Sequence, residues 1–127
     1  MKISQIIYEL LNDAFPGVDV YMDFIDQSVS LQSATGIILI KDMTTNSDGS
    51  KDLTSATRPY ESTFRIEVIG HKDAYMTLEA IRDDIRAEMI GYRDETITLI
   101  DFARAYSDGN DVAEVKRFIQ DFTIIYK

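Results

Sequence analysis

The stretch TFRIEVIGHKDAYMTLEAIRDDIRAEMIG, residues 63–91, decides the fold of this 127-residue chain. Its first residues alternate apolar with polar side chains, and the apolar positions are Phe64, Ile66 and Val68. A period of two is typical of a strand with one buried face, so the pattern predicts a strand over residues 62–69. Beyond residue 72 the apolar positions recur every three or four residues, which predicts a helix over residues 73–90.

The predicted helix carries one apolar stripe, formed by Ala74, Leu78, Ile81, Ile85 and Met89. Asp73 is predicted to cap its N-terminus, and Gly91 is predicted to end it in a left-handed conformation. We expect Ile81 and Ile85 to be buried under the sheet, and Met76 to help fill the core. The charged side chains expected on the solvent side are Glu79, Arg82, Asp83 and Arg86.

Weaker patterns on either side complete the order of elements. They predict a helix over residues 2–14, strands over 18–24, 36–43, 96–102 and 115–126, and a turn at 107–111. Residues 37–40 are apolar on both faces, which is typical of a central strand. The order α-β-β-loop-β-α-β-β predicts one α+β domain spanning residues 1–127, with two helices packed on one face of a mostly antiparallel sheet.

A long polar loop interrupts this order at residues 44–60. Residues 44–58 read TTNSDGSKDLTSATR, and Leu53 is their only large apolar side chain. A segment this polar cannot be buried, and a loop this long inside a compact domain usually has a function. The residues that we predict to form an assembly contact are Asp48, Lys51, Asp52, Arg58 and Tyr60.

The composition limits the classes of partner. A formal charge of −9 disfavours general binding to nucleic-acid phosphates. No apolar run approaches the length of a membrane span, and the N-terminus lacks the apolar region of a signal peptide. We therefore expect neither a membrane nor a specific nucleic acid as a partner.

The sequence contains no recognisable catalytic or metal-binding motif. It has no cysteine, and its only histidine, His71, has no nucleophile or orienting partner placed by the pattern. Asp48, Ser50 and Asp52 alternate around Gly49 as calcium ligands would, but the glycine and glutamate positions of an EF-hand loop do not fit. The prediction is a protein without enzymatic activity, metal or cofactor.

The order of elements resembles that of one protein family. The segments that carry the likeness are TFRIEVIG (63–70), the helix DAYMTLEAIRDDIRAEMIG (73–91) and the closing strand FTIIYK (122–127), together with the short N-terminal helix and the polar excursion. In these features the chain resembles the small neck proteins of long-tailed bacteriophages, which are called tail terminators, tail-completion proteins or minor capsid proteins. The likeness covers nearly the whole chain but includes no invariant catalytic residue.

The resemblance implies an α+β sandwich that works as a ring, usually a hexamer, in the virion neck, after assembly in the cytoplasm of the bacterial host. Such a ring caps the tail tube, stops its polymerisation and docks the head connector, and DNA can pass through it. The family builds the rim of the ring from loops, and residues 44–60 correspond to one by position. A closed ring requires heterologous contacts, for which the sheet edges and this polar loop are the predicted surfaces.

A second class remains as an alternative. Small acidic chaperones of needle-type secretion systems bind an effector protein as a dimer, have a similar order of elements and also lack active sites. They normally end in another helix and dimerise through the second helix, whereas this sequence ends in a predicted strand. Its second helix has a single apolar stripe, which its own core requires. The pattern favours the neck protein, with an enzyme as a distant third, and the oligomeric state separates a ring from a dimer.

Overall fold

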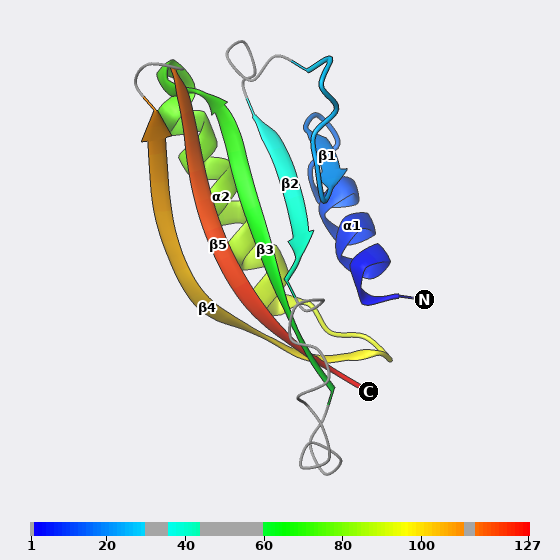
Figure 1. Ribbon diagram of the computed structural model, residues 1–127. Helices are drawn as coiled ribbons and strands as arrows, with labels where there is room; N and C mark the ends of the chain where they lie inside the picture. The colour runs from blue at the N-terminus through cyan, green and yellow to red at the C-terminus, as the bar shows by residue number, and fades with distance from the viewer. Residues whose placement is uncertain (1, 30–35, 44–59, 111–113) are drawn as a thin grey trace.

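The computed structural model describes residues 2–29, 36–43, 60–110 and 114–127 (Figure 1). The elements follow the predicted order: α1 (Ile3–Ala14), β1 (Asp19–Met22), β2 (Ile37–Asp42), β3 (Tyr60–His71), the 3-10 turn η4 (Lys72–Ala74), α2 (Tyr75–Gly91), β4 (Ile97–Asn110) and β5 (Val115–Tyr126). The predicted polar loop lies outside the described residues, except for Tyr60 at the start of β3.

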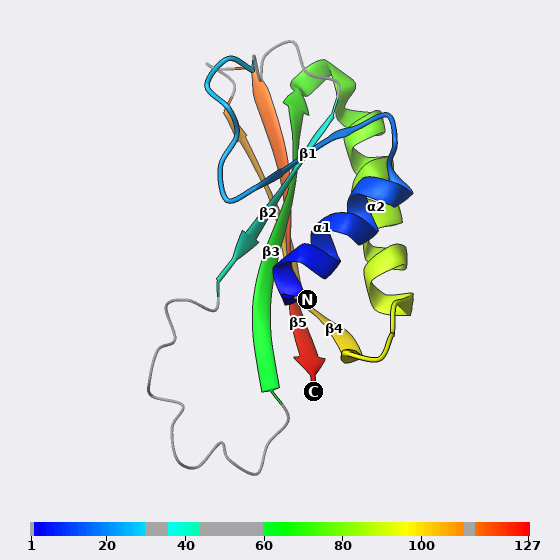
Figure 2. The same cartoon turned by 90° about the vertical axis from the view of Figure 1, so that its right-hand side faces the viewer.

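The five strands form one sheet in the order β1-β2-β3-β5-β4. β1 runs parallel to β2, and all other neighbours are antiparallel. Figure 2 shows both helices on one side of this sheet. The predicted α+β fold is therefore confirmed, and β2 is an internal strand as its apolar run indicated. The closing strand β5 is internal as well, so the edges of the sheet are β1 and β4.

The core lies between the helices and the facing side of the sheet. The inward residues of β3, Phe64, Ile66 and Val68, are buried there as their alternation predicts. They meet three buried residues of α2 (Leu78, Ile85 and Met89) and three of α1 (Ile6, Ile7 and Leu11). Ile81 packs against this cluster but is only partly buried, because it lies at the border of the apolar stripe.

The predicted ends of the second helix are wrong in detail. α2 begins at Tyr75 with Ala74 at its N-cap and no side-chain cap. The side-chain cap belongs to the preceding turn η4, where His71 Nδ1 accepts a hydrogen bond from the backbone N–H of Asp73 (3.0 Å). Gly91 is the last helical residue, and no glycine among the described residues has a positive φ. The chain leaves the helix through an extended Tyr92 instead of a left-handed glycine.

Two predicted strand boundaries also differ from the structure. β4 continues through the expected turn at 107–111 as far as Asn110, because β5 offers it backbone partners up to the pair Asn110–Val115. β1 ends at Met22, since Asp23 has a positive φ of 68°, and Phe24 is 76% exposed. Met76, expected in the core, is 81% exposed because it lies on the outer side of the first turn of α2.

Two arginines of α2 cover the border of the core instead of facing solvent. The guanidinium of Arg86 lies 4.1 Å from the ring centre of Phe102, and that of Arg82 lies 4.8 Å from that of Phe118. Gln120, which is fully buried on β5, accepts a hydrogen bond from Arg86 Nε (2.8 Å) and donates one to the carbonyl of Arg82 (3.0 Å). Arg82 also lies 3.8 Å from Glu79, one turn earlier on the helix.

Candidate assembly surface

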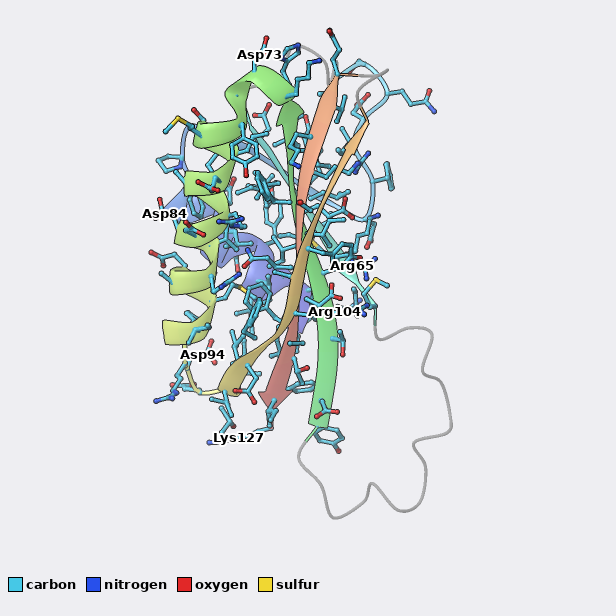
Figure 3. The ribbon with its side chains drawn as sticks, turned by 90° about the vertical axis from the view of Figure 1, so that its left-hand side faces the viewer. Arg65, Asp73, Asp84, Asp94, Arg104 and Lys127 are labelled. Atoms are coloured by element: carbon cyan, nitrogen blue, oxygen red, sulfur yellow. The ribbon has the colours of Figure 1, made fainter. Side chains whose placement is uncertain are left out.

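The face of the sheet opposite to the helices carries a network of ion pairs. Figure 3 shows Arg65 and Arg104 on this side, away from α2. At its centre on β3, the buried carboxylate of Glu67 accepts contacts from Lys41 Nζ (2.9 Å) and from an Arg117 guanidinium nitrogen (2.8 Å). Because β2 and β5 flank β3, one carboxylate joins three strands.

A second buried carboxylate, Asp121 on β5, is bound by two arginines. Arg65 donates two hydrogen bonds to it (2.9 and 3.3 Å), and Arg104 Nε donates a third (2.7 Å). Burial alone would raise the pKa of Asp121, but these hydrogen bonds and the positive charges outweigh burial and lower its pKa below the usual range. Asp121 is therefore a carboxylate at neutral pH, and it ties β3, β4 and β5 together.

This face of the sheet carries both signs of charge. Four cations surround two buried carboxylates, and strand register places two exposed carboxylates, those of Glu61 and Asp101, on the same face. The most exposed cations are Arg104, with 65% of its side chain accessible, and Lys41, with 37%. The partly exposed ring of Tyr106 lies 5.8 Å from both Arg65 and Arg104. We call this surface the charged sheet face; its cations are Lys41, Arg65, Arg104 and Arg117, and Tyr106 lies beside them.

An open hollow of about 570 Å³ lies between α1 and the connection from α2 to β4. Ile6 and Leu10 provide its apolar part, and its rim carries four carboxylates, those of Glu9, Asp13, Asp94 and Glu95. None of these four forms an ion pair with a cation among the described residues. We call this surface the acidic hollow.

Asp94 is fixed in place at the rim of the acidic hollow. It accepts hydrogen bonds from the backbone N–H groups of Ile97 (2.6 Å) and Thr96 (2.7 Å) and from the hydroxyl of Tyr92 (2.6 Å). These bonds lower the pKa of Asp94, and the bond to Asp94 raises the pKa of Tyr92 to about 12. The rim therefore holds a stable negative charge in a defined position.

Of the residues predicted for the assembly loop, Asp48, Lys51, Asp52 and Arg58 lie outside the described part of the chain. Tyr60 is described: it begins β3, is 67% exposed, and stacks on Tyr126 with ring centres 5.6 Å apart. The alternation in β3 placed Arg65 and Glu67 on the polar face. This alternation did not predict which residues Arg65 and Glu67 pair with, because the partners come from strands that are distant in sequence. Sequence reasoning therefore missed both surfaces.

His71 has a local structural environment. Besides capping η4, its Nε2 lies 3.6 Å from a carboxylate oxygen of Glu114. No group of three or more histidine, cysteine, aspartate or glutamate residues in the described part of the chain is placed to hold a metal ion. None of the helices that the structure describes is long and apolar enough to cross a membrane.

Replacing His71 with Ala is expected to cost about 0.5–2 kcal/mol of stability, because the turn loses its cap, and to leave assembly intact. Denaturant unfolding and native mass spectrometry would measure the two effects. The control is His71→Asn, which retains a capping acceptor but not an imidazole. Loss of function in both variants, with folding retained, would contradict a purely structural role.

Neither a family model nor a curated protein matches this sequence. A solved structure does match the fold. It is a chain of the "Virion of native gene transfer agent (GTA) particle", with a TM-score of 0.62 and 16% sequence identity. The likeness covers 94% of this chain and 90% of that one. At this level of identity, the similarity shows a shared fold.

Proposed function

We propose that this protein is a structural component of a phage-like virion and has no enzymatic activity. The observation that carries the proposal is the likeness, over nearly the whole length of both chains, to a chain of a gene transfer agent virion. The elements that the sequence resemblance used, the β3–α2 unit and the closing strand β5, are present in this fold.

The finer proposal is that the protein forms the neck ring, which ends the tail tube and joins tail to head. Its partners are then further copies of itself, six in the usual ring, together with the tail-tube protein and the head connector. The predicted single domain of residues 1–127 would be the repeating unit, and the ring would surround the path of the DNA.

Native mass spectrometry of the purified protein, with and without the tail-tube protein, tests this proposal. A closed ring of identical subunits that binds the tube protein is the expected result. A stable dimer would favour the alternative, an acidic secretion chaperone. A monomer at all concentrations, alone or with the tube protein, would contradict both. In favour of the ring, Leu78, Ile85 and Met89 of α2 are buried inside the subunit and are not available for the helix-mediated dimer of such chaperones.

The polar loop at 44–60 is proposed to contact the neighbouring neck proteins. Reversing both of its cations, Lys51→Glu with Arg58→Glu, is expected to weaken docking several-fold without unfolding the subunit, because charges at the rim of an interface act mainly through encounter rate. Binding to the tail-tube protein at two salt concentrations, the thermal midpoint and the tail length would be measured on the same variant. Asp48→Lys with Asp52→Lys is the opposite reversal in the same loop. Unchanged docking and normal tails in both variants would show that the loop is not a contact.

A further inference from the structure

We propose that copies of this chain join by strand addition: the free edge of β4 in one copy pairs with β1 of the next, so that the five-stranded sheets continue edge to edge. This inference rests on the proposed ring, and it names the two surfaces through which the subunits join. β4 and β1 are the two edge strands of the sheet, and Figure 1 shows them at opposite ends of it. Contacts between two different surfaces on opposite sides join copies head to tail, as a ring requires.

The first argument is the free edge of β4. This strand of 14 residues pairs with β5 on one side, and no strand of the described residues lies on its other side. It contains no proline and no lysine, which are residues that often protect an exposed edge from pairing. A long free edge presents a row of backbone N–H and C=O groups to which a further strand can bind.

The second argument is strand direction. β1 is parallel to β2, and each of the steps from β2 to β3, from β3 to β5 and from β5 to β4 is antiparallel. β1 and β5 therefore run in the same direction. A copy that is rotated about an axis along the strands brings its β1 antiparallel to β4, with the helices of both copies on the same side. The added strand then takes the place on one edge of β4 that β5 takes on the other.

The four residues of β1 match one stretch of β4. β5 pairs with residues 100, 101, 102 and 104 of β4, and Ala103 is left out of the register. A neighbouring strand can therefore follow this irregularity. We assign β1 of the next copy to the same four residues, and the resulting pairs, with the residue of β1 named first, are Met22–Ile100, Tyr21–Asp101, Val20–Phe102 and Asp19–Arg104.

On the helix side of the sheet, this register places apolar residues opposite apolar residues. Ile100 and Phe102 lie on that side, since their partners on β5 are buried in the core. Val20 and Met22 belong to the same core at the other edge of the sheet. Cross-strand pairs of apolar side chains stabilise a sheet, so the apolar layer under the helices would continue from one copy to the next.

On the other side of the sheet, the same register places opposite charges together. Arg104 is 65% exposed and donates one hydrogen bond, to Asp121 on β5 (2.7 Å). Asp19 is exposed and forms no ion pair with any described residue. Asp19 of the next copy would place the Arg104 guanidinium between two carboxylates. Asp101 lies opposite Tyr21, so no two carboxylates are directly opposite each other, which would be unfavourable.

Cysteine cross-linking tests this register, because the natural sequence contains no cysteine. The variant with both Tyr21→Cys and Asp101→Cys places two thiols opposite each other across the contact, within reach of a disulfide or of a short bifunctional thiol reagent. Oxidation is expected to give a ladder of covalent oligomers on a non-reducing gel, which ends at the number of subunits in the ring. Each single variant is expected to remain uncross-linked. A covalent dimer of Asp101→Cys alone would indicate a two-fold contact through β4 and would overturn the proposal.

A measurement of charge is independent of the cysteines. Asp19→Lys is expected to raise the concentration for half-assembly at least about threefold, because two cations then lie opposite each other. In a protein that already carries Arg104→Gln, the same change is expected to have an effect of less than about twofold, since the opposing cation is gone. Asp84→Lys is the matched control, because it changes the net charge equally at an exposed position of α2.

The control for cross-linking is Tyr21→Cys with Asp84→Cys, and thermal midpoints show whether each variant folds. A ring in native mass spectra whose β1–β4 cysteine pair gives no more ladder than this control would overturn the contact and leave the neck function standing. An equal effect of Asp19→Lys with and without Arg104 would also overturn the contact. Failure of the unmodified protein to self-associate would remove the proposed ring, and this contact with it.

Discussion

Replacing Ile85 with Ala is expected to destabilise the protein by about 2–5 kcal/mol, because it removes three buried carbon atoms and leaves a cavity. Ile85 is completely buried between α2 and the sheet, in the cluster that contains Leu78 and Met89. Neighbouring side chains on the rigid sheet can collapse into such a space only in part. Urea unfolding, followed by far-UV circular dichroism, would measure the change in the free energy of unfolding.

The matched control for Ile85 is Asp83, two residues earlier on the same helix. Its carboxylate is exposed and pairs with Arg82 at the surface (2.9 Å), so Asp83→Ala is expected to change stability by only about 0.5 kcal/mol. Similar losses at the two positions would mean that the buried face of α2 is assigned wrongly.

Replacing Asp121 with Ala is expected to cost about 2–4 kcal/mol, which is somewhat below the usual loss when one partner of a buried ion pair is removed. The change leaves Arg65 and Arg104 facing each other on the sheet without their shared carboxylate. The loss stays below the full value because Arg104 is largely exposed and water can solvate it. Asp101→Ala, at an exposed position of the adjacent strand β4, is the control, with an expected change of about 0.5 kcal/mol or less.

The contribution of Asp121 also depends on pH in a defined direction. Its pKa is lowered in the folded protein, so its contribution to stability is fully present above the unfolded value of about 3.9 and is lost as the pH falls toward the folded pKa. The difference in stability between the natural protein and Asp121→Ala is therefore expected to shrink below about pH 4. A difference that stays constant from pH 7 to pH 3 would show that the ion pairs do not cause the loss.

The two helices and the strand β3 could be predicted from sequence because each displays a local period, and β2 could be predicted from its continuous apolar run. The alternation of Phe64, Ile66 and Val68, and the stripe that includes Leu78 and Ile85, record which face each element buries. Burial of apolar surface is the dominant favourable term in folding, so a strong period survives in the finished structure. The same apolar pattern predicted that the closing strand ends at residue 126 and that the chain folds as an α+β sandwich.

Boundaries that depend on a partner were predicted less well. Residues 107–110 are polar and resemble a turn, yet they continue β4 because β5 supplies hydrogen-bond partners along its whole length. His71 replaces Asp73 as the cap because β3 runs directly into the 3-10 turn. These outcomes depend on backbone geometry on both sides of the junction, which composition does not encode.

The sequence by itself determined the class of fold, the order of its elements and the inward face of β3 and α2, since these depend on neighbours within a few residues. Only the tertiary structure decided that β5 lies between β3 and β4, that Arg104 and Arg65 share Asp121, and that α1 and the α2–β4 connection enclose an acidic hollow. The physical reason is that strand order and register bring together residues far apart in the chain, such as Arg65 and Asp121, which are separated by 56 positions. The energy of such contacts depends on the distance between the two residues in space, and a local period in the sequence does not encode that distance.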